Sequence, residues 1–107
     1  MNIYRKAIFI PTLGAPKIII IAADMSELNE YIGCDSCSAR SINYADDLGY
    51  ALVLFNDEKS QEKNLVLNPL ASRILGQNGG ISGNCVLVDI NKGLVIEDLK
   101  KIVAMTS

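Results

Sequence analysis

The sequence predicts an α+β fold with a mixed, mostly antiparallel sheet of about five or six strands and three short helices. Half of the 107 residues are apolar, which suits a single domain over residues 1–107 and excludes a disordered chain. The apolar residues form short β-branched runs between clusters of Gly, Pro, Asn and Asp. Strands and helices do not alternate regularly, which disfavours a doubly wound parallel sheet.

The N-terminal part of the chain predicts a β-hairpin. Residues 3–10 are rich in β-branched and aromatic side chains and end at Pro11, and residues 17–22 form a second strand. Two prolines and a glycine mark the turn between them. The unbroken isoleucines of the second strand predict that both of its faces are covered, so we expect it near the centre of the sheet.

A short helix is predicted over residues 25–32. Asp24 has the position of an N-cap, and Glu27, three residues later, completes a capping box. Gly33 is placed to end the helix in the left-handed conformation.

The middle of the chain predicts strands separated by turns. A strand is expected near residues 38–44, followed by a turn at 46–49 and a second strand over 50–55. Residues 56–64 hold five charges and little apolar content, so we expect a solvated loop there. A short strand should follow at residues 65–67.

Asn68 and Pro69 mark the start of another helix, since Asn is a good N-cap and Pro suits the first helical position. Gly76 should end it. The remaining expected elements are a Gly-rich loop, an alternating strand and a final helix, over residues 77–83, 84–90 and 96–105.

Composition excludes several function classes. The chain contains no histidine, which removes Ser-His-Asp and Cys-His catalysis and the commonest metal ligand. A formal charge of −2 disfavours nucleic-acid binding. The longest apolar run has six residues, 18–23, whereas a membrane span needs about 20. Three cysteines do not make a disulfide framework, so we expect a cytoplasmic protein. We also expect no cofactor and no metal.

Five short motifs between Asp24 and Asp89 point further. They are Tyr31-Ile32-Gly33, Ile42-Asn43-Tyr44, the run from Tyr50 to Glu58, Leu67-Asn68-Pro69-Leu70-Ala71, and the run from Ile81 to Val88. This series resembles a family of small bacteriophage and mobile-element proteins known as a domain of unknown function. The chain departs from the family pattern at Cys34-Asp35-Ser36-Cys37 and at Asp89, where the family usually has glycine.

The resemblance implies a phage or mobile-element origin and hence the cytoplasm of the host, and it supplies no reaction. Because small phage proteins often inhibit host defence, we expect a non-enzymatic binding protein that inhibits a host factor. It would bind a host protein or sequester a small, anionic, nucleotide-like signal, and a homo-oligomer suits either role. The alternatives are a small enzyme with carboxylate or Cys chemistry and a structural, self-assembling module.

An anionic ligand would need cations and free backbone N–H groups, and glycines let such groups approach an anion closely. The chain has only three arginines, Arg5, Arg40 and Arg73. The candidate ligand-binding residues are Arg40, Asn68, Arg73, Gly79, Gly80, Ser82 and Asn84. The Gly-rich segment also suits a plain tight connection, and the two arginines also suit ordinary exposed positions.

The cysteines and carboxylates are the remaining chemical groups. Cys34 and Cys37 form a C-x-x-C motif that is consistent with semi-buried thiols, a reversible disulfide or a metal site. The motif follows a helix C-terminus, which does not activate a thiol. Asp46-Asp47 and Asp57-Glu58 fall in predicted turns, where solvent should keep them ordinary, and Asp89 could face the core or water.

Overall fold

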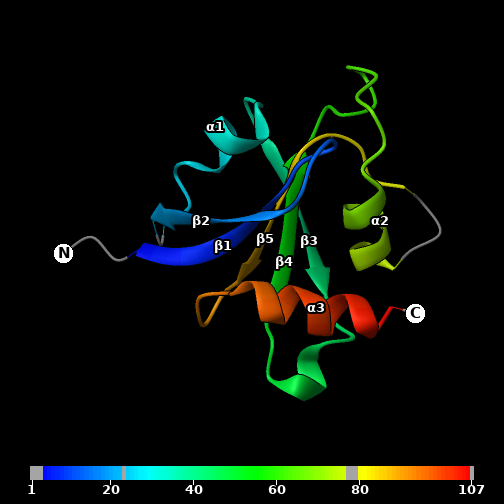
Figure 1. Ribbon diagram of the computed structural model, residues 1–107. Helices are drawn as coiled ribbons and strands as arrows, with labels where there is room; N and C mark the ends of the chain where they lie inside the picture. Colours follow the sequence, from blue (N-terminus) through cyan, green and yellow to red (C-terminus); the bar gives the residue numbers. More distant parts are fainter. Residues whose placement is uncertain (1–3, 23, 77–79, 107) are drawn as a thin grey trace.

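The structure is a computed structural model that describes residues 4–22, 24–76 and 80–106 (Figure 1). In chain order, the described elements are β1 (Tyr4–Ile10), β2 (Lys17–Ala22), α1 (Leu28–Ile32), β3 (Cys37–Ile42), the 3₁₀ helix η1 (Asp46–Leu48), β4 (Leu52–Asp57), α2 (Pro69–Leu75), β5 (Cys85–Asp89) and α3 (Ile96–Ala104). None of the helices in these residues has the length and apolar composition that crossing a membrane requires.

The five strands of the described chain form one sheet in the order β2-β1-β5-β4-β3. Every neighbouring pair is antiparallel, and the three α-helices pack on the sheet, so the predicted α+β class is confirmed. The prediction that residues 3–10 and 17–22 form a hairpin is also confirmed.

The predicted central position of the second strand is wrong, because β2 lies at an edge of the sheet. Ile19 and Ile21 are buried beneath α1, whereas Ile20 on the other face is 56% exposed. Ile18, on the same face as Ile20, is partly buried against the other core, so the run of isoleucines reflects one covered face and one that is only partly covered. The central strand is β5, which contains an aspartate and a cysteine and is buried at all five positions.

Two hydrophobic cores lie on opposite faces of the sheet, and Figure 1 shows α1 apart from α2 and α3. Strand β5 supplies both, with Val86 and Val88 in the core beneath α1 and Cys85 and Leu87 in the core beneath α2 and α3. The predicted alternation of this strand is confirmed. Each fully buried Val or Leu side chain contributes roughly 1.5–3 kcal/mol, so this strand needs helices on both faces.

The predicted capping box of the first helix is wrong. Met25 has a φ of 63°, in the left-handed region, and cannot continue into the helix. Asp24 instead accepts a hydrogen bond from the Ser26 N–H at 3.0 Å within a turn. Glu27 occupies the N-cap position and makes no side-chain capping bond. Gly33 ends the helix in the left-handed conformation, with φ 80°, as predicted.

The predicted loop over residues 56–64 is wrong at residues 56 and 57. Both belong to β4 and are buried, because this strand runs two residues beyond its predicted end at 55. The predicted strand at 65–67 reduces to one isolated bridge between Leu67 and Ser82. The predicted turn at 46–49 contains η1, whose end is Gly49 in the left-handed conformation.

Asn68 connects three parts of the fold. Its Oδ1 accepts a hydrogen bond from the Ala71 N–H at 3.0 Å, which caps α2 as predicted. Its Nδ2 donates to the backbone oxygens of Ile10 and Gly83, both at 2.9 Å. The side chain is fully buried, so these three bonds hold α2 against the end of β1 and the segment that enters β5.

We predict that Asn68→Ala lowers the free energy of unfolding by about 2–4 kcal/mol, since it removes a cap and leaves two buried carbonyl oxygens without a donor. Urea denaturation followed by circular dichroism measures the change. The control is Asn43→Ala at an exposed position, where we expect a change within about 0.5 kcal/mol. Equal effects at the two positions would contradict this role for Asn68.

Candidate functional site

The candidate ligand residues do not gather at one place. Arg40 lies on the edge strand β3, and Arg73 lies in the last turn of α2, where its Nε donates to Thr106 Oγ1 at 2.8 Å. Arg5 donates to the backbone oxygens of Asp89 and Ile90. Gly79 lies outside the described residues. The arginines therefore hold separate positions and form no common anion clamp.

The described glycines of the Gly-rich segment serve close packing. A Cβ at Gly80 would lie 2.5 Å from Leu67 Cδ1, and Gly83 has a φ of 84°. The Gly83 N–H donates to Val66 O, and the Ile81 N–H donates to Ser72 Oγ. Because both N–H groups are used within the fold, this part of the segment is a tight connection.

Three further candidates also serve the fold. Asn68 is fully buried, and its side chain bonds to groups of the fold: the three bonds described above and a longer contact of Nδ2 with Cys85 Sγ at 3.8 Å. Ser82 forms the isolated bridge with Leu67. Asn84 accepts a hydrogen bond from the Thr12 N–H at 3.1 Å. We therefore do not include these three residues in the candidate site.

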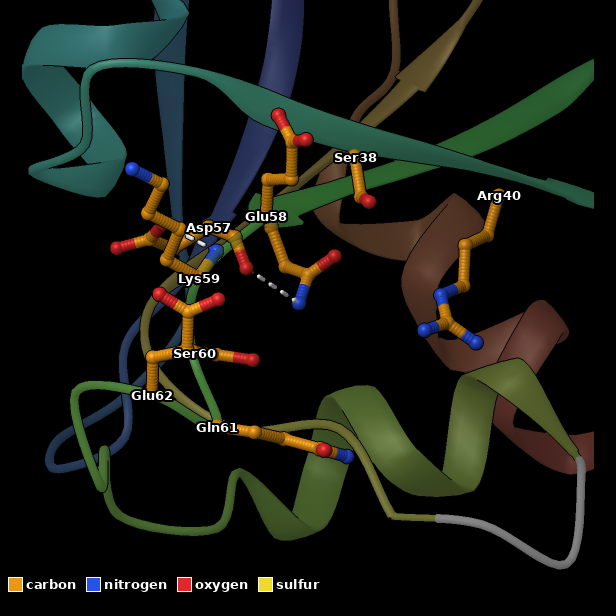
Figure 2. Close-up of a pocket in the computed structure, with 9 residues that line it drawn as sticks. Ser38, Arg40, Asp57, Glu58, Lys59, Ser60, Gln61 and Glu62 are labelled. Atoms are coloured by element: carbon orange, nitrogen blue, oxygen red, sulfur yellow. Dashed lines mark hydrogen bonds between the residues drawn. The ribbon is translucent and has the colours of Figure 1, made fainter.

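Arg40 lines a hollow of about 310 Å³ (Figure 2). Its lining residues, which define the β3–β4 hollow, are Ser38, Arg40, Asn56, Asp57, Glu58, Lys59, Ser60, Gln61 and Glu62. In the antiparallel register, Ser38 is opposite Asn56 and Arg40 is opposite Leu54. Side chains of residues directly opposite each other lie on the same face of a sheet. Because Leu54 belongs to the core beneath α2 and α3, Ser38, Arg40 and Asn56 lie on the face that these helices cover elsewhere.

The sheet topology explains why a hollow forms there. The pairing of β4 with β5 ends at Phe55, opposite Val86. Asn56 and Asp57 extend beyond it and pair only with β3, opposite Ser38 and Cys37. This two-stranded end of the sheet lacks the neighbouring strand that supplies the apolar core.

Asn56 is the most informative residue of the hollow. It is 2% exposed, its Nδ2 donates to Asp57 O at 3.3 Å, and among the described residues its Oδ1 has no hydrogen-bond partner. Leaving a buried acceptor unpaired costs about 1–3 kcal/mol, so such an atom is a candidate to receive a ligand's donor. Sequence reasoning missed it, although Leu52, Leu54 and Asn56 continue one inward alternation.

Arg40 supplies a cation to the hollow. Figure 2 shows its guanidinium and the hydroxyl groups of Ser38 and Ser60 pointing into the space between the strands and α2. The guanidinium of Arg40 has no hydrogen-bond or ion-pair partner within the described residues. The Glu58 carboxylate turns away and accepts a hydrogen bond from Ser36 Oγ at 2.6 Å.

The expectation that Asp57 is solvated is wrong, because its side chain is 3% exposed and pairs with Lys63 Nζ at 2.7 Å. The hydrogen bond from Lys63 lowers the pKa of Asp57, and the bond from the Lys59 N–H at 2.9 Å acts in the same direction. Asp57 is therefore a fixed, neutralised anion at the back of the hollow.

Asp89 is the second buried carboxylate, and it too holds the backbone. Its Oδ2 accepts from the Ala51 N–H at 3.1 Å, and its Oδ1 accepts from the Asn91 N–H at 2.8 Å. Asp46, Asp47 and Glu58 are exposed, as the predicted turns implied. In the described chain, no three Cys, Asp or Glu side chains gather in a way that would hold a metal ion.

A second hollow, of about 210 Å³, lies on the side of α1 and is lined by Thr12, Ile32, Gly33, Asp57, Lys63, Leu65, Val66, Gly83 and Asn84. Three of its polar side chains are already paired: Asp57 with Lys63, and Asn84 with the Thr12 backbone N–H. It offers a ligand fewer uncommitted polar groups than the β3–β4 hollow does.

Comparisons with known proteins bear on the fold alone. No protein-family model and no curated protein matches the sequence. The chain is similar to part of a solved structure described as the crystal structure of small RNA methyltransferase HEN1, with a TM-score of 0.72 and 15% sequence identity. The match covers 95% of this chain and 16% of that one, so the likeness concerns a small part of a much longer protein.

We predict that Lys63→Met destabilises the protein at neutral pH, because it leaves the buried Asp57 carboxylate without its ion-pair partner. A lowered pKa stabilises the fold above the ordinary pKa of Asp, and this contribution is lost as the pH falls through the lowered value. The urea midpoints of variant and wild type should therefore converge in acid. Lys100→Met at an exposed position of α3 is the control, and a gap that persists unchanged in acid would refute the prediction.

Proposed function

We propose that this protein is a non-enzymatic binding protein that takes a small anionic ligand into the β3–β4 hollow. The observation that carries the proposal is the unpaired, buried Oδ1 of Asn56, which lines the same hollow as the uncommitted guanidinium of Arg40. A fold retains an unpaired buried acceptor at a cost in stability, and a ligand that donates to it recovers that cost.

The residues of the hollow define the chemistry of its ligand. Asn56 Oδ1 requires an N–H or O–H donor. Arg40 suits a phosphate or carboxylate, which guanidinium binds through two parallel hydrogen bonds. The volume of about 310 Å³ is at the lower end of the range for small-molecule sites, roughly 300–1,000 Å³. A nucleotide-like molecule, with a base that donates and a phosphate that accepts, meets these requirements.

The resemblance to small phage and mobile-element proteins supplies the biological setting. In that setting, the protein acts in the host cytoplasm and sequesters a nucleotide-like signal of a host defence system. The use of Asp57 and Asp89 as backbone and ion-pair acceptors supports binding over acid–base catalysis, which needs a carboxyl group poised to exchange protons.

A second candidate is the binding of a host protein or a second copy through an open edge of the sheet. On β3, the residues Ala39, Arg40 and Ser41 are exposed, and β4 is the one strand that pairs with it within the described chain. An exposed edge can add a strand from a partner. We rank this candidate second, because every open sheet has edges, whereas the unpaired Asn56 oxygen is specific to the hollow.

Arg40→Ala and Arg73→Ala form a matched pair that tests the site. We predict that a member of a panel of nucleoside monophosphates and cyclic nucleotides raises the Tm of the wild type. Arg40→Ala should weaken its binding at least about tenfold in isothermal titration, because a charge-assisted contact is lost. Arg73→Ala changes charge equally but lies outside the hollow and should bind as the wild type does. No thermal response to the panel, or equal losses in both variants, would count against the proposal.

Asn56→Leu separates binding from stability. The substitution removes a buried, unpaired oxygen and also the 3.3 Å hydrogen bond from Nδ2 to Asp57 O. Because the two effects oppose each other, we predict that the ligand-free protein gains at most about 1 kcal/mol in the free energy of unfolding. The same variant should lose its response to the nucleotide that stabilises the wild type. A variant that is destabilised and still binds would show that Asn56 serves the fold and not a ligand.

A further inference from the structure

Cys34 and Cys37 bring their sulfur atoms to 2.9 Å from each other. A disulfide bond is about 2.05 Å long, so the bond needs only a small further approach of the two side chains. Both residues are half-buried, which leaves them within reach of a dissolved reagent, whereas Cys85 is fully buried in the core. The two half-buried cysteines are therefore the candidates for redox chemistry in this chain.

Backbone contacts hold the segment between the two cysteines from both ends. The Cys34 N–H donates to Asn29 O at 3.0 Å, and Asn29 Nδ2 donates to Asp35 O at 3.1 Å. On the other side, Ser36 O accepts a hydrogen bond from the Glu58 N–H at 3.1 Å. The short sulfur–sulfur distance follows from this anchored geometry, so the two thiols meet without a search by a flexible loop.

The surroundings of Cys37 disfavour its thiolate form. Burial, together with a hydrogen bond between the Cys37 and Cys34 thiols, raises the pKa of the Cys37 thiol to about 12. The segment follows the C-terminus of α1, where the helix dipole disfavours negative charge. Dithiols whose thiolate is strongly stabilised make oxidising disulfides, so a pair without that stabilisation keeps its disulfide more firmly.

We propose that Cys34 and Cys37 are a reversible redox site that a small-molecule disulfide, such as oxidised glutathione, converts to an intramolecular disulfide. The Cys34 thiolate attacks one sulfur of the reagent and releases one glutathione thiolate, which leaves a mixed disulfide on Cys34. Cys37 then gives up its proton to the solvent, and its sulfur attacks Cys34 Sγ and displaces the second glutathione thiolate. Two protein thiols are oxidised, one glutathione disulfide is reduced to two thiols, and the protons pass to those thiols.

The bond would join the end of α1 to the first residue of the edge strand β3. Cys37 packs with the core beneath α1, on the sheet face opposite the β3–β4 hollow. The redox site therefore does not depend on the proposed ligand, and either proposal can fail while the other holds.

The experiment equilibrates the folded wild-type protein in buffers of varied reduced and oxidised glutathione. Acid stops the exchange, and free thiols are then labelled with a maleimide after unfolding. Mass spectrometry should show a species that lacks two hydrogen atoms and carries one label, on Cys85, and dithiothreitol should return it to three labels. We also expect the oxidised form to melt higher by on the order of 5 °C, because the bond restricts the unfolded chain.

Three variants complete the test. Cys85→Ser should still form the bond, whereas Cys34→Ser and Cys37→Ser should take up glutathione as a mixed disulfide or stay reduced. The proposal is overturned if the wild type gains glutathione without forming the internal bond. It is also overturned if both thiols stay free in buffers that oxidise a peptide of residues 30–40, or if Cys85→Ser abolishes the bond.

Discussion

The architecture depends on the burial of β5 on both faces of the sheet. Val86 and Val88 require a cover on one side, and Leu87 requires a cover on the other. Helix α1 supplies the first, and α2 and α3 supply the second. Helices α2 and α3, which precede and follow β5 in the sequence, lie on one face of the sheet, and α1 lies on the other. Asn68 then fixes α2 to the strand ends beneath it.

The candidate site lies at the end of β4 that does not pair with β5. Beyond Phe55, β4 has no β5 neighbour, and the two following residues become polar. Asn56 faces the side of α2 and lines the hollow, whereas Asp57 pairs with Lys63. The same two-stranded end carries Cys37 opposite Asp57. One end of the sheet thus places a polar hollow on one face and a close pair of thiols on the other.

Two buried asparagines show how a polar group of the fold differs from a candidate ligand group. Asn68 uses its oxygen and its amide nitrogen for three hydrogen bonds, and its burial is compensated within the chain. Asn56 is almost as buried, but its side-chain oxygen has no hydrogen-bond partner in the part of the chain that the structure describes. Because an uncompensated acceptor costs stability, its retention beside Arg40 is more informative than burial itself.

The sequence alone determined the local features: the helix start at Asn68-Pro69, the left-handed end at Gly33 and the alternation of β5. Each depends on a few neighbouring residues and on backbone geometry, so a short window contains the information. Only the tertiary structure decided that β2 lies at an edge and that Asn56 is buried. Strand order and burial depend on partners far away in the chain. Asn56, for example, pairs with Ser38 of β3, eighteen positions away in the sequence, which no local pattern contains.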